Sequence, residues 1–162
     1  GVALRLPGGS VSRVRIVHAP VLRSVAGSST ATVYDDIELI DNANLELVDL
    51  PALQFAGAIK VESNAHLANL SLPSLAHVYG DVRIGLQYNG LAAPNDALTA
   101  LDLGGGGPYE LEGGLYIGHI SSAAEGTGVA LRLPDTVAGD VVLFSAASIS
   151  SVWAGRGLTR IP

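Results

Sequence analysis

Apolar residues recur along this chain with a period of about 22 residues, most clearly in the consecutive stretches 37–57 and 59–80. These stretches read "IELIDNANLELVDLPALQFAG" and "IKVESNAHLANLSLPSLAHVYG". Each opens with alternating apolar residues, passes through Asn-Ala, and reaches Leu-Pro before a closing Gly. Self-similarity at a fixed period of this length is typical of solenoids, in which each unit stacks on the next. The pattern therefore predicts a repetitive coil.

The apolar pair that opens each unit can be followed along most of the chain. Its first residues are Val14, Ile37, Ile59, Val82, Leu115 and Val141. Two of the intervals between them are long, which predicts insertions that form loops in an otherwise regular coil. The hexapeptide "VALRLP" also occurs twice, at residues 2–7 and 129–134, and the same offset aligns Leu22 with Ile149. The repeat should therefore extend over both ends of the sequence.

Within each unit the apolar residues alternate with polar ones, which is the periodicity of a β-strand. Gly, Pro, Asn and Asp interrupt the strands, as expected at turns. A leucine-rich horseshoe, in which each strand is followed by a helix, is the alternative fold. It requires helical spacing in every unit, and the segments 50–57 and 72–80 are short and end in Gly. The sequence therefore favours an all-β fold, a β-solenoid with stacked parallel strands.

Composition agrees with one domain spanning residues 1–162. Apolar residues make up 48% of the chain, enough for a core, whereas charged residues make up only 15%. A net charge of −6 argues against nucleic acids and anionic membranes as partners. No segment approaches the roughly 18 apolar residues of a membrane span, so we expect no direct membrane insertion. The absence of Met suggests a module excised from a longer protein, and the absence of Cys excludes disulfides.

The run from Gly57 to Ile84 resembles the receptor L-domain repeat. That repeat occurs in ligand-binding lobes of growth-factor receptors and in fungal cell-wall proteins anchored by a glycolipid. The resemblance covers residues 37–86 well and residues 2–25 and 98–152 more loosely. It implies a right-handed parallel β-helix of about six short turns, located outside the cell and working by surface contact without catalysis. The disulfides and the capping helix that usually close such domains are not evident in this sequence.

Asn42 and Asn64 occupy the same position in successive repeats. We interpret them as a short asparagine ladder, with side-chain amides turned inward to bond neighbouring backbone groups. Asn89 is displaced from the next position by an insertion.

No residue set suggests catalysis, a metal or a cofactor. Glu110 and Glu112 could share one face of a strand, but no basic residue accompanies them in the repeat. The four histidines lie on different repeats without the spacing of a metal site. The glycine-rich segment 104–114 lacks the residues of a phosphate-binding loop, and we interpret it as a corner insertion.

If a ligand site exists, the insertions at 85–97, 104–114 and 119–128 are its expected place, because loops carry binding residues more often than regular strands do. The candidate contacts are Tyr88, Asn89, Asn95, Asp96, Tyr109 and Glu110. Asn69 begins the sequon "NLS" and could carry a glycan if the protein is secreted by a eukaryote.

We therefore expect a non-enzymatic extracellular module, structural or adhesive, within a cell-surface or appendage protein. Its expected partners are copies of itself or adjacent domains. The first alternative is a ligand-binding L-domain whose inserted loops recognise a protein or a glycan. The second is a polysaccharide-active β-helix enzyme, which would need clustered carboxylates and a basic partner.

Overall fold

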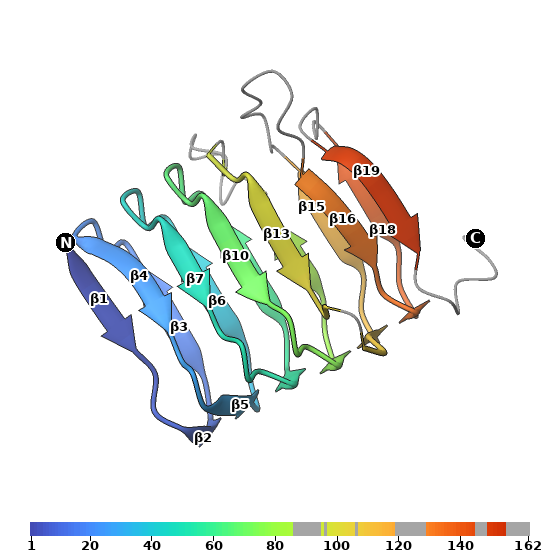
Figure 1. Cartoon of the computed structure of the whole chain (residues 1–162), viewed down its shortest axis with the longest axis horizontal. Helices are drawn as coiled ribbons and strands as arrows, with labels where there is room; N and C mark the ends of the chain where they lie inside the picture. The colour runs from blue at the N-terminus through green and yellow to red at the C-terminus, as the bar shows by residue number, and fades with distance from the viewer. Residues whose placement is uncertain (86–94, 96, 106, 119–128, 145–148, 155–162) are drawn as a thin grey trace.

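A computed structural model describes the chain except for residues 86–94, 96, 106, 119–128, 145–148 and 155–162. Every secondary-structure element in the described part is a β-strand, and every paired strand is parallel to its neighbour. Figure 1 shows them stacked layer upon layer, with β1 at one end and β19 at the other. The chain is therefore a parallel β-solenoid, as the sequence predicted.

Three sheets run along the solenoid, and each of the first five layers contributes one strand to each sheet. Sheet A contains β1 (Val2–Arg5), β4 (Leu22–Ala26), β7 (Leu47–Asp49), β10 (Asn69–Leu72) and β13 (Ala100–Leu103). Sheet B contains β2 (Gly9–Val11), β5 (Thr30–Val33), β8 (Phe55–Ala56), β11 (His77–Val78), β14 (Glu110–Leu111) and β17 (Thr136–Val137). Sheet C contains β3 (Val14–Val17), β6 (Ile37–Ile40), β9 (Ile59–Glu62), β12 (Val82–Ile84), β15 (Leu115–Gly118) and β18 (Val141–Phe144). A separate two-stranded sheet pairs β16 (Val129–Leu133) with β19 (Ile149–Ala154).

The register of sheet C follows the apolar repeat of the sequence. Ile37 pairs with Val14 on one side and with Ile59 on the other, and Leu115 pairs with Val82 and Val141. The strands are spaced by about 23 residues and describe about five turns, one fewer than expected. The pairing continues across the insertions, because β15 pairs with β12 before it and with β18 after it.

The core is a column of aliphatic side chains enclosed by the three sheets. Leu70 lies between Val48 and Leu101 in sheet A and is fully buried. Alternation places every second residue of a strand in this column, so stacking on neighbouring layers supplies the burial that one short strand cannot. The equivalent apolar residues of the repeats 37–57 and 59–80 are all in the core: Ile37, Leu39, Leu45, Val48, Leu50, Leu53, Ile59, Val61, Leu67, Leu70, Leu72 and Leu75.

The two "VALRLP" segments occupy equivalent places in the fold. Val2 pairs with Leu22, and Val129 pairs with Ile149. In both strand pairs the register shifts immediately after this first residue. The offset deduced from the sequence is therefore confirmed, including a shared irregularity that periodicity alone does not predict.

The corner between sheets B and C brings backbones into close approach. A Cβ added at Gly113 would lie 2.4 Å from the carbonyl carbon of Gly80 in the layer before it. The next layer repeats the arrangement, because Gly139 donates its N–H to the carbonyl of Gly113 at 3.0 Å. Only glycine allows the layers to stack this closely at that corner.

Candidate functional site

Buried asparagines link successive layers at the corner that follows sheet C. The Asn64 Oδ1 accepts the backbone N–H of Asn42 at 3.0 Å, and the Asn64 Nδ2 donates to the carbonyl of Leu39 at 2.8 Å. Asn42 repeats this pattern one layer earlier, with the N–H of Ala19 and the carbonyl of Ile16. Each amide therefore bonds the backbone of the preceding layer, as expected for a structural ladder.

Asn95 is the third member of this ladder. Its side chain is fully buried, its Oδ1 accepts the N–H of Asn64 at 2.8 Å, and its Nδ2 donates to the carbonyl of Val61 at 2.9 Å. Asn95 is one of the ligand contacts expected from the sequence, and its burial corrects that expectation. A usable signal was present: Asn42, Asn64 and Asn95 each stand three residues before a buried leucine.

Of the other expected ligand contacts, the structure describes Tyr109 and Glu110. Tyr109 is fully buried, so it contributes to the core and not to a binding surface, which is a second correction. Burial raises the pKa of its hydroxyl far above the usual range. Glu110 is exposed on β14, whereas Tyr88, Asn89 and Asp96 lie outside the described residues.

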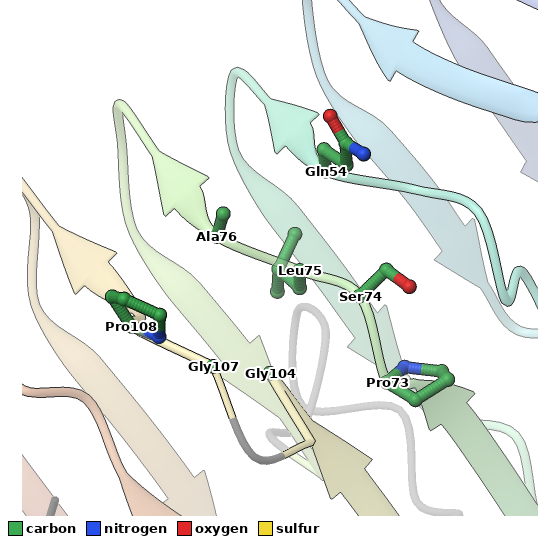
Figure 2. Close-up of a pocket in the computed structure, with 8 residues that line it drawn as sticks. All are labelled: Gln54, Pro73, Ser74, Leu75, Ala76, Gly104, Gly107 and Pro108. Atoms are coloured by element: carbon green, nitrogen blue, oxygen red, sulfur yellow. The ribbon is translucent and has the colours of Figure 1, made fainter.

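A shallow groove borders the glycine-rich insertion at the corner between sheets A and B (Figure 2). Gln54, Ser74 and Pro108 come from three neighbouring layers, and their side chains are drawn around the opening in Figure 2. The remaining lining residues are Pro73, Leu75, Ala76, Gly104 and Gly107. No lining residue is charged, so the groove offers shape and a few hydrogen-bonding groups but no acid or base.

Exposed aromatic side chains gather on the outer face of sheet B. Tyr34 and Tyr79 are 68% and 58% exposed, and Phe55 lies between their layers. His77 pairs with Phe55 in the sheet, and its ring lies 4.4 Å from the ring of Tyr79, centroid to centroid. This grouping was not predicted from the sequence, because the prediction rests on the inward-facing positions of the repeat.

Two carboxylates adjoin these rings. The His77 Nε2 lies 2.9 Å from a carboxylate oxygen of Glu112, and its Nδ1 lies 3.4 Å from one of Glu110. Both glutamates are exposed, as is usual for charged side chains on a solvated face. The face nevertheless combines aromatic rings with acidic groups, which a purely solvated face does not need.

The outer face of sheet C is neutralised by its own ion pairs. The Lys60 Nζ donates to Asp36 at 2.7 Å and to Glu38 at 3.1 Å. The hydrogen bond to Asp36 has the largest effect on Lys60. Together with the bond to Glu38, it raises the pKa of Lys60 above its usual value despite partial burial. Arg15 pairs with Glu38 at 3.1 Å. Glu38 thus lies between Arg15 and Lys60 of the two adjacent layers.

Glu62, at the end of β9, is a buried acid. Burial raises the pKa of its carboxyl group, while the charges of Arg83 and Lys60 partly oppose that effect. Within the described ranges, no group of three or more His, Asp or Glu side chains is arranged to hold a metal ion.

Asn69 of the sequon lies on β10, flanked in sheet A by Leu47 and Ala100. Its side chain points outward, opposite to that of Leu70, and is half-buried. Its glycosylation stays a prediction.

A search of the described residues for helices long and apolar enough to cross a membrane found none. Comparison of the chain with protein-family models, with curated proteins and with solved structures found no match.

Proposed function

We propose that this chain is a non-enzymatic structural or adhesive module of an extracellular, cell-surface or appendage protein. It acts by stacking its end layers on further layers of the same kind. We propose that a second copy of the chain covers the end layers. The competing possibility is that adjoining domains of the same polypeptide cover them. The extracellular setting rests on the resemblance to receptor L-domain repeats.

The observation that carries this proposal is the different exposure of one hexapeptide at two places. Val2 and Leu4 in the first layer are 55% and 37% exposed. Their equivalents in the second hexapeptide, Val129 and Leu131, are both 1% exposed. The same side chains are thus core residues when a layer covers them and an apolar surface when none does.

The last described layer has the same property. Leu143 pairs with the buried Ile117 and Val152 pairs with the buried Leu131, yet Leu143 and Val152 are 38% and 45% exposed. The first and last layers of the described residues therefore present side chains from core positions of the repeat. Covering them gains about 25 cal/mol per Å² of apolar surface and pairs the free edges of the strands. Contact between unlike ends does not close on itself, so it generates a filament.

Sedimentation velocity over a concentration series tests this proposal. We expect the 162-residue chain to associate as its concentration rises, and Leu4→Lys to reduce that association. Leu47→Lys is the matched control, because Leu47 is 36% exposed but points outward from sheet A. A wild-type chain that stays monomeric at high concentration, or equal effects of both substitutions, would refute assembly through the first layer.

A second candidate is recognition of a protein or glycan ligand at the corner insertions, as in a ligand-binding L-domain. The groove in Figure 2 favours it, because Gly104, Gly107 and Pro108 of the glycine-rich segment line a recess together with residues of the two preceding layers. Shortening this corner should abolish ligand capture while leaving the association state unchanged. The absence of charged groups from the groove supports a non-enzymatic role over a polysaccharide-active enzyme.

A further inference from the structure

On the outer face of sheet B, aromatic rings lie beside two carboxylates that both pair with one histidine. We define the sheet B patch as Phe55, His77, Tyr79, Glu110 and Glu112. Among the described residues, the ion pairs of both glutamates are with the single imidazole of His77. Even a protonated imidazole leaves one negative charge in excess beside the exposed rings of Tyr79 and Phe55.

On the neighbouring outer face of sheet C, a cation of the chain itself contacts both an aromatic ring and a carboxylate. Arg83 lies over the ring of Tyr116, 5.3 Å from its centroid, and its guanidinium pairs with Asp81 at 3.0 Å. Arg83 and Tyr116 are direct partners on adjacent strands, as are His77 and Glu110 in the patch. Sheet C therefore supplies ring, acid and cation, whereas the sheet B patch supplies ring and acid.

We propose that the sheet B patch docks a protein segment that presents arginine or lysine side chains. The cation occupies the position that Arg83 takes on sheet C, over an aromatic ring and beside a carboxylate. Cation–π contact and charge pairing act together in that arrangement. A neutral glycan would use the rings alone and leave the two carboxylates without a role. Charge complementarity therefore selects a basic polypeptide, and this site is independent of the end layers.

Peptide titration by calorimetry tests the proposal. The probe is a blocked heptapeptide in which arginine alternates with serine, and its control carries glutamine in place of arginine. We expect the arginine peptide to bind the wild-type chain and the glutamine peptide not to bind. Replacing both carboxylates (Glu110→Gln with Glu112→Gln) should weaken binding by about tenfold. Tyr79→Leu, which keeps apolar area but removes the ring, should weaken it about threefold.

A charge-matched variant separates a local site from general attraction to an acidic protein. Glu46→Gln with Asp49→Asn removes the same two charges from residues beside or within β7 of sheet A, away from the patch. Affinity within about twofold of wild type is expected for this control. An equal loss in both double variants would overturn the proposal, as would a Tyr79→Leu variant that binds the peptide normally. Binding of neutral oligosaccharides that depends on Tyr79 but not on the glutamates would overturn it in favour of a glycan. Circular dichroism of each variant establishes that the solenoid is intact.

Discussion

Replacing Asn64 with alanine should be among the most destabilising single changes in this chain. The fully buried side chain accepts the N–H of Asn42 and donates to the carbonyl of Leu39. Alanine removes both hydrogen bonds and leaves two backbone groups of the preceding layer without these partners in a site closed to water. A buried polar group left unsatisfied costs about 1–3 kcal/mol, so two groups give a loss of roughly 2–6 kcal/mol. Domains of this size have only about 5–15 kcal/mol of stability to lose.

Asn44→Ala is the matched control for this substitution. The Asn44 side chain also donates to the preceding layer, to the carbonyl of Pro20 at 2.6 Å, but in an exposed position. Water can replace that bond, so the expected cost is below about 1 kcal/mol. Urea denaturation of both variants measures the difference, and hydrogen exchange at the Asn42 amide locates it. A loss below 1 kcal/mol for Asn64→Ala, or unchanged exchange at Asn42, would refute the ladder as a source of stability.

Three further substitutions test the packing and the electrostatics of the solenoid. Leu70→Ala should cost about 2–5 kcal/mol in urea denaturation, because it opens a cavity in the middle of sheet A, and a cost near zero would contradict the core register. Gly113→Ala should cost roughly 1–3 kcal/mol, since its Cβ would meet the backbone of the layer before it, whereas Gly107→Ala should be neutral because its Cβ would meet nothing within 4 Å. Glu62→Gln should raise stability at neutral pH. The raised pKa means that the folded state binds this proton more tightly than the unfolded state, so the wild type loses stability as pH rises from the usual value of 4.5 through the folded-state pKa. Denaturation across that range should show the advantage of Glu62→Gln disappearing at acidic pH, and an advantage independent of pH would contradict the assigned cause.

Much of the solenoid follows from local pattern, because its contacts repeat with the sequence. Ile37 and Ile59 occur one period apart and are paired neighbours in sheet C. In a stacked coil each residue meets its equivalent one turn away, so periodicity in sequence becomes register in space. Alternation then decides which side chains face inward, as the burial of Leu70 and the outward position of Asn69 show.

The insertions limited the prediction of the site. Asn95 looked like a loop residue because a long insertion separates it from Asn64, and only the closed corner shows that it continues the ladder. Tyr109 looked available for binding because it adjoins a glycine-rich segment, and only packing shows its ring in the core. Periodicity contains no information about where the chain re-enters the stack after an irregular loop.

By itself, the sequence determined the class of fold, the strand register and the core column of this protein, because these depend on contacts between equivalent positions one turn apart. The tertiary structure alone decided which outward side chains meet. Glu112 meets His77 only because the path between the layers brings β14 beside β11. The exposure of Leu4 and the burial of Leu131 within the same hexapeptide have the same origin, since burial depends on whether another layer covers the strand.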